Sequence, residues 1–156
     1  MKNYQRKPPT KILLFALLEA AILFGLACGK QVETARKTQS RTNEATAVSA
    51  LQNIFRAQTQ YSVMHSGDYG TFDQLVAEGS LDRRYAGSSP VLEGYVFTIR
   101  VVPQSGGGDP SFSVNADPKE VEGAPSGVRH LYLDSSSNVI RTNPTQAAKA
   151  SDPPLQ

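Results

Sequence analysis

Few residues in this chain have the types and spacing needed for acid–base or metal chemistry, and the two histidines are the first to consider. His130 alternates with Tyr132 and Asp134 on one face of a predicted strand, and Ser135 follows, so these residues superficially resemble parts of a hydrolase site. The chain has no Gly-x-Ser-x-Gly turn to hold a nucleophile. We therefore interpret His130 as a solvent-facing strand residue and expect no enzymatic activity.

Acidic side chains in the C-terminal half offer a second kind of chemistry, because carboxylate oxygens are the ligands that calcium prefers. The metal candidates are Asp117, Glu120 and Asp134, with Asp109 and Glu122 nearby in sequence. Their spacing is not that of an EF-hand loop. The alternative is that they are hydrated surface residues, so we expect no obligatory cofactor and keep calcium as a possible ligand.

The charge distribution argues against nucleic-acid binding. The formal net charge is +2, but the segment 1–28 holds four of the 16 basic residues and one of the 14 acidic residues. The rest of the chain is nearly neutral, and beyond 30–41 it has no run of basic residues that would displace counterions from phosphates. We exclude a nucleic-acid partner on this basis.

The N-terminal segment has the pattern of an export signal or membrane anchor. Basic residues from Lys2 to Lys11 precede an apolar run from Ile12 to Cys28. At about 1.5 Å per residue this run covers roughly 25 Å, somewhat less than the roughly 30 Å hydrocarbon core of a bilayer. The positive flank would stay in the cytoplasm, so we expect a bacterial cell-envelope protein, anchored in the membrane, with its soluble part outside the cytoplasm.

Cys28 is the only cysteine, so the chain cannot form an internal disulfide. The sequence from Leu26 to Gly29 resembles the end of a bacterial lipobox, in which the cysteine is lipidated and becomes the new N-terminus. Cys28 is therefore a candidate lipidation site. The alternative is a buried thiol in a retained transmembrane helix.

The rest of the sequence predicts one long helix followed by strands. Apolar residues recur at helical spacing between 42 and 63, and Thr71 can cap a short helix that ends near Gly79. Two-residue alternation then predicts strands over 95–102 and 112–116, and a terminal hairpin formed by 129–134 and 139–142. Beyond Asn143 no periodicity remains, so we expect a disordered tail.

This order of elements predicts an α+β fold in which a long N-terminal helix packs on a small antiparallel sheet, because neither element can bury its apolar face alone. The expected organisation is an N-terminal signal or anchor segment (1–28), a polar stalk or tether (29–41), a globular domain (42–143) and a disordered tail (144–156).

The chain resembles type IV pilins and the pseudopilins of type II secretion over most of its length. Phe15 to Glu19 is similar to the start of a mature pilin, where an aromatic residue is followed four residues later by glutamate. The segments 43–61 and 67–72 and the strand 131–134 are similar to the lower helix, loop and sheet of minor pilin-like proteins.

The resemblance implies roles for individual residues. Phe15 and Glu19 would act in subunit assembly, with Glu19 paired to the N-terminal amine of a neighbouring subunit, since a carboxylate in hydrocarbon is costly unless paired. The alternative is that Glu19 reaches the interface or is removed with a cleaved leader. The family also implies calcium binding near the sheet loops.

The function that we expect is non-enzymatic: assembly in a pilus-like or type II secretion-like system, or protein binding. The expected partners are the membrane and, if the segment assembles, other copies or pilin-like subunits. The alternative is a solitary periplasmic lipoprotein that acts as a binding module, with calcium as a candidate ligand, without forming filaments.

Overall fold

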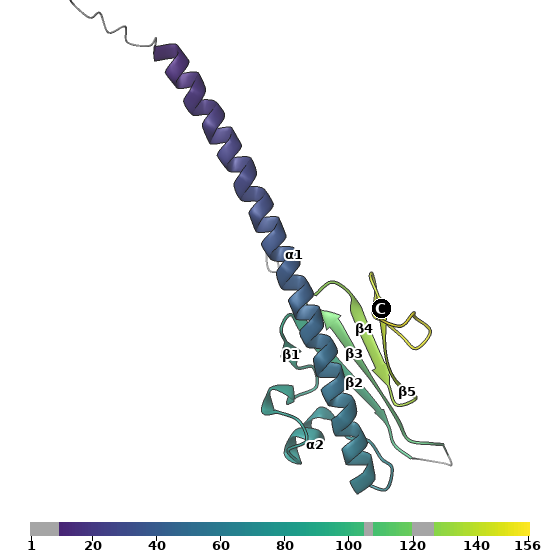
Figure 1. Ribbon diagram of the computed structural model, residues 1–156. Coiled ribbons are helices and arrows are strands. Elements are labelled where there is room, and N and C mark those ends of the chain that lie inside the picture. Colours follow the sequence, from purple (N-terminus) through teal and green to yellow (C-terminus); the bar gives the residue numbers. More distant parts are fainter. Residues whose placement is uncertain (1–9, 105–107, 120–126) are drawn as a thin grey trace, which may run out of the picture. The chain divides into compact units, whose positions relative to one another are not determined.

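The computed structural model describes residues 10–104, 108–119 and 127–156, with side chains described from residue 31 onward within these ranges. The chain divides into two compact units, residues 1–37 and 38–156, and the second contains the sheet and the core. Figure 1 shows the elements in order: α1 (Thr10–Met64), α2 (Phe72–Ala77), the 3-10 turn η1 (Arg83–Tyr85), β1 (Val91–Leu92), β2 (Tyr95–Val102), β3 (Ser111–Pro118), β4 (His130–Asp134) and β5 (Ser137–Asn143).

Helix α1 buries one stripe of side chains within the second unit, as the spacing of apolar residues predicts. The buried apolar residues on this stripe are Ala47, Ala50, Leu51, Ile54, Ala57 and Tyr61. The helix ends where Ser66 adopts a left-handed conformation with φ 57° and the amide of Gly67 donates to the carbonyl of Ser62 at 2.8 Å. This bond satisfies a carbonyl of the last turn and closes the helix.

The short helix α2 is also confirmed, together with its predicted cap. The hydroxyl of Thr71 accepts a hydrogen bond from the amide of Gln74 at 3.4 Å, and the Gln74 side chain accepts one from the amide of Thr71 at 2.8 Å. This reciprocal capping box satisfies two amides that the first turn leaves free. Phe72 and Leu75 are buried, so α2 is held by packing as well as by its cap.

The sheet is an antiparallel meander of five strands in the order β1-β2-β3-β4-β5. Residues that lie directly opposite each other on neighbouring strands share a face of the sheet. Val114 lies opposite Leu133 on the face toward α1, and Thr98 lies opposite Asn115 on the other face. The inward side chains that are buried are Tyr95, Phe97, Phe112, Val114, Ala116, Leu131 and Leu133. They form one core with the stripe of α1. The expected α+β class, with a long helix packed on an antiparallel sheet, is confirmed.

A bidentate ion pair joins α1 to the segment that leads into β4. The guanidinium of Arg129 donates from Nη2 to Oε1 of Glu44 at 2.5 Å and from Nε to Oε2 at 3.3 Å. The Glu44 side chain is only 13% exposed, so this carboxylate depends on Arg129 for its charge partner. The hydroxyl of Tyr95 donates to the carbonyl of Arg129 at 3.0 Å, which fixes the same segment from β2.

Two features differ from the sequence prediction. Strand β1 was not anticipated, because a two-residue strand carries too few residues to show an alternating pattern. The disordered tail is corrected as well: Leu155 donates from its amide to the carbonyl of Ile140, Arg141 pairs with Pro154, and Ala148 is buried. The tail is ordered because its backbone bonds to the outer edge of β5, and composition alone does not reveal such a partner.

Candidate functional site

Several residues that the sequence singled out lie outside the described side chains. Phe15, Glu19 and Cys28 belong to the part of α1 whose side chains are not described, and Glu120 lies within 120–126. Their candidate roles in assembly, lipidation and metal binding remain predictions. Among the described residues, no helix combines the length and the apolar character required to cross a membrane.

The structure does not bring the two described metal candidates together. Asp134 pairs with Ser113 across β3 and β4, and Asp117 lies four residues further along β3, roughly 13 Å away at about 3.3 Å per residue. Each carboxylate has its own partner, since Asp134 accepts from the Ser136 hydroxyl at 2.6 Å and Asp117 contacts His130. No group of three possible metal ligands converges in the described parts of the chain.

Both histidines contact carboxylates. His130 Nδ1 lies 2.6 Å from Oδ1 of Asp117, and the ring is 24% exposed. His65 Nε2 lies 2.6 Å from Oε1 of Glu78, and its ring stacks on Tyr61 with centroids 3.8 Å apart. His130 is therefore less exposed to solvent than expected, because one side of its ring contacts Asp117. Each of the two contacts connects different elements of the fold.

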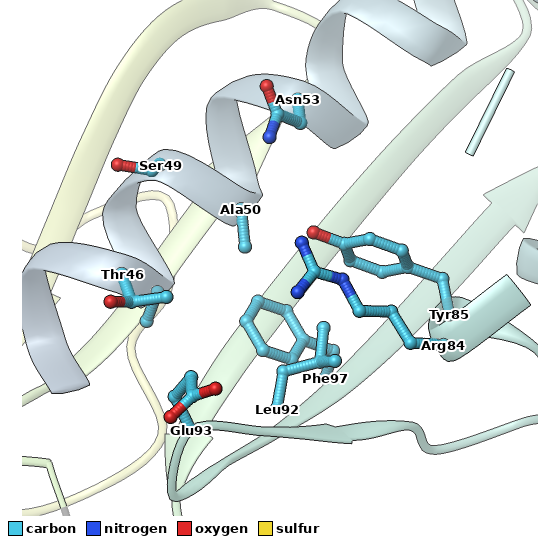
Figure 2. A pocket seen from close by; sticks show the side chains of 10 residues that line it. Thr46, Ser49, Ala50, Asn53, Arg84, Tyr85, Leu92, Glu93 and Phe97 are labelled. Carbon is cyan, nitrogen blue, oxygen red and sulfur yellow. The ribbon is translucent and has the colours of Figure 1, made fainter. Parts of the chain in front are cut away.

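A small hollow of the second unit lies between α1 and the segment that runs from η1 to β2. Its wall on α1 is formed by Thr46, Ala47, Ser49, Ala50 and Asn53, and the opposite wall by Arg84, Tyr85, Leu92, Glu93 and Phe97. Figure 2 shows the Arg84 side chain running alongside the Tyr85 ring, with Glu93 at the other end of the pocket. The Arg84 guanidinium carbon is 5.7 Å from the Tyr85 ring centroid.

The local backbone explains how these residues reach the pocket. The Asp82 carboxylate accepts from the amide of Arg84 at 2.9 Å and begins η1, which places Arg84 beside the buried ring of Tyr85. Glu93 has a φ of 45° and, with Gly94, forms the two-residue turn between β1 and β2. Such turns favour left-handed backbone conformations, so the tight hairpin determines the position of Glu93.

The pocket places opposite charges at its two ends over an apolar floor, and its volume limits what it can bind. The cavity measures about 70 Å³, whereas sites for small-molecule ligands are typically about 300–1,000 Å³. Burial raises the pKa of Tyr85, so its phenol stays neutral beside Arg84 at neutral pH. The pocket is therefore smaller than a typical metabolite site.

A shallower groove continues from this pocket along α1. It shares Asn53, Arg84 and Tyr85 with the pocket and is also lined by Arg56 and Leu81. The Arg56 guanidinium donates to the Asn53 amide oxygen at 2.6 Å, which keeps its charge at the groove. Together the two hollows place Arg56 and Arg84 along one flank of α1, with the carboxylates of Asp82 and Glu93 on the same surface.

Sequence reasoning missed this surface. The local signals were the pair Arg83-Arg84 directly before an aromatic residue and the turn sequence Glu93-Gly94, both between the elements that showed periodicity. Neither signal indicates that Arg84 and Glu93 face the same flank of α1. Only the packing of η1 and of the β1–β2 hairpin brings them together.

Comparisons of this chain with protein-family models, with curated proteins and with solved structures find no match.

Proposed function

We propose that this chain is a non-enzymatic, membrane-tethered protein of the bacterial cell envelope with a pilin-like or pseudopilin-like domain. It acts in a pilus-like or type II secretion-like assembly or in protein binding. The observation that carries this proposal is the extent of α1, which begins at Thr10 and ends at Met64. The apolar sequence from Ile12 to Cys28 therefore belongs to the same helix whose later turns contribute the core of the second unit.

The polar part of α1 supports the role of a tether. Every side chain from 31 to 37 is exposed, and Glu33 pairs with Lys37 one turn later at 3.2 Å between Oε1 and Nζ. A pair of oppositely charged side chains at this spacing stabilises a solvated helix by about a few tenths of a kcal/mol. A helix that remains regular without burying its side chains is suited to separate an anchored segment from a folded domain.

The described polar side chains support a binding role over catalysis. His130 and His65 each hold a carboxylate that belongs to another element of the fold, which is a structural use of a histidine. The pocket beside α1 has room for a single side chain, and the surface around it carries both arginines and carboxylates, which fits contact with a protein surface of mixed charge. These features fit a protein whose task is to contact other proteins.

The test of this proposal combines intact mass spectrometry of the membrane-extracted protein with cross-linking. A chain that begins at Phe15 and forms cross-links between copies through a photoreactive residue at position 18 supports filament assembly. A Glu19→Gln variant should then lose these cross-links. Intact mass should show that it is still cleaved at the same N-terminal position, because the substitution removes the charge but not the apolar segment.

The alternative function, a solitary lipoprotein binding module, is favoured by the sequence from Leu26 to Gly29. It predicts a mature chain that begins at a diacylglyceryl-modified Cys28, stays monomeric and melts at a higher temperature when calcium is added. A protein that is recovered uncleaved and dissolved in the cytoplasm would contradict both the assembly role and this alternative.

A further inference from the structure

The two edges of the sheet differ in how far their outward-facing backbone groups are hydrogen-bonded. At the edge formed by β5, the tail bonds to the strand: the amide of Thr142 donates to the carbonyl of Pro153 at 3.0 Å, and the amide of Leu155 donates to the carbonyl of Ile140 at 2.8 Å. Pro153 and Pro154 have no amide hydrogen to offer a further strand. The chain itself therefore covers this edge from Ile140 to Thr142.

At the opposite edge, β1 covers only one end of β2 (Figure 1). Its two residues pair with Tyr95 and Val96, and the last bond on this side runs from the amide of Phe97 to the carbonyl of Pro90 at 2.9 Å. The rest of β2, from Thr98 to Val102, pairs with β3 on its other side only, as far as the described residues go.

The direction of each backbone group along this part of β2 follows from the ladder. In an antiparallel sheet, the amide and carbonyl of one residue point to the same neighbour, and those of the next residue point to the other side. Since the amide of Phe97 points toward β1, the amides and carbonyls of Ile99 and Val101 point to the uncovered edge. In the described parts of the chain, nothing is bonded to them there.

The side chains of the uncovered part distinguish its two faces. Thr98, Arg100 and Val102 lie on the outer face and are exposed, whereas Ile99 and Val101 lie on the core side and are only partly buried. An added strand would therefore extend the apolar core on one face and meet Arg100 on the other. Among the described residues, Arg100 takes part in no ion pair.

We propose that the uncovered edge of β2, from Ile99 to Val101, binds an extended segment of a partner protein as an added antiparallel strand. The central residues of that segment alternate as apolar, acidic, apolar. Its apolar residues form hydrogen-bonded pairs with Ile99 and Val101 and cover their half-buried side chains. Its acidic residue lies opposite Arg100 in a non-hydrogen-bonded pair, where cross-strand side chains are closest.

A second copy of this chain would satisfy this edge less well than an acidic segment. The tail occupies its β5 edge from Ile140 to Thr142, so these residues cannot pair with another sheet. Two β2 edges paired symmetrically about Arg100 would place two guanidinium groups directly opposite each other, which is destabilising. Pairing about Ile99 or Val101 would place Arg100 opposite Thr98 or Val102 and give it no carboxylate partner. The inference deepens the proposed assembly role and rests on it for the identity of the partner.

The experiment uses the full chain with the peptide acetyl-Lys-Thr-Val-Asp-Val-Thr-Lys-amide as the probe. Hydrogen exchange measured with millimolar peptide should slow at the amides of Ile99 and Val101 and remain unchanged at Thr98 and Arg100, which already bond to β3. A peptide with both valines N-methylated should bind at least tenfold more weakly, because it cannot form the ladder.

Charge reversal separates strand addition from nonspecific binding. The peptide with lysine in place of aspartate should bind about fivefold to tenfold more weakly to the natural chain, and Arg100→Glu should reverse this preference. Arg83→Glu is the matched control, since Arg83 is exposed on η1 and should leave the preference unchanged.

Three results would overturn the proposal: no protection of Ile99 and Val101, equal binding of the N-methylated peptide, or a concentration-dependent dimer that protects these amides without peptide. The proposed function is tested by N-terminal processing and cross-links at the apolar segment, so either idea can fail without the other.

Discussion

Gln58 on α1 and Gly70 in the following loop exchange two hydrogen bonds across twelve residues of sequence. The Gln58 amide nitrogen donates to the Gly70 carbonyl at 2.6 Å, and its amide oxygen accepts from the Gly70 amide at 2.9 Å. Gln58 is completely buried. Its side chain bonds both backbone polar groups of Gly70, as a neighbouring strand would do in a sheet. A Cβ at Gly70 would lie 3.1 Å from the Tyr61 ring, so a larger residue there would require the ring to shift by a few tenths of an ångström.

Replacing Gln58 by leucine should destabilise the second unit strongly. The substitution leaves the buried amide and carbonyl of Gly70 without partners, and each unsatisfied group costs about 1–3 kcal/mol. We expect a loss of about 2–4 kcal/mol in the free energy of unfolding, measured by urea denaturation of the full chain with circular dichroism. Gln60→Leu is the control at an exposed position and should change stability by less than about 0.5 kcal/mol. Equal effects of the two variants would contradict this role of Gln58.

The ion pair between Glu44 and Arg129 should show measurable coupling in a double-mutant cycle. Glu44→Gln and Arg129→Lys each remove the bidentate geometry, and the largest cause of the raised pKa of Arg129 is its hydrogen bond to Glu44. Arg129 is 33% exposed, so solvent screens part of the interaction. We expect a coupling energy of about 1–2 kcal/mol from urea denaturation of the four proteins. An additive cycle would mean that the pair contributes no stability.

Stability should fall at alkaline pH because of Tyr95. Burial, followed by the charge of Glu44, raises the pKa of Tyr95 to about 12, from 10.0 for an unperturbed tyrosine. The folded state therefore favours the neutral phenol. Its contribution is complete below pH 10 and is lost as the pH rises toward 12, because only the unfolded chain releases the proton in that window.

The Tyr95→Phe variant isolates this contribution, since Tyr61, Tyr85 and Tyr132 also have raised pKa values. We expect the free energy of unfolding of Tyr95→Phe to decline less steeply than that of the natural chain between pH 10 and 12. Urea denaturation at several pH values measures the difference. Parallel curves for the two proteins would show that Tyr95 titrates normally in the folded state.

The ordered tail predicts different outcomes for two neighbouring alanines. Ala148 is 3% exposed, and its carbonyl accepts a hydrogen bond from the Asn115 side chain at 2.7 Å, whereas Ala147 is exposed. Ala148→Asp should therefore release the tail from β5 and cost about 2 kcal/mol or more, because it buries an unpaired charge. Limited proteolysis should cut the tail of this variant sooner than that of Ala147→Asp. Equal cutting would indicate that Ala148 does not hold the tail.

The sequence predicted those parts of the fold whose signal is local. The stripe through Leu51 and Ile54, the cap at Thr71 and the alternation in 95–102 each depend on residues within one element, and α1, α2 and β2 follow them closely. Strand β1 and the tail were missed because their order comes from partners elsewhere: Val91 pairs with Val96 around a tight turn, and Pro154 pairs with Arg141.

The candidate surfaces were harder to predict for the same reason. Arg84 and Glu93 line the same pocket because two separate turns face one flank of α1. The spacing of these residues in the sequence does not show that the two turns lie close together. The uncovered edge of β2 depends on how short β1 is, which becomes evident only once the ladder is known. The pairing of Asp117 with His130 likewise follows from the register of β3 and β4.

The prolines at the far side of β5 also set a limit on stoichiometry. A sheet that is open at both sides can serve as a template for an unlimited row of molecules, which is how cross-β fibrils grow. Here the tail with Pro153 and Pro154 occupies the β5 edge from Ile140 to Thr142 and blocks such growth along that stretch. We therefore expect each molecule to accept one added strand, at β2, and concentrated solutions to remain free of fibrils for as long as residues 153–155 stay bonded to β5.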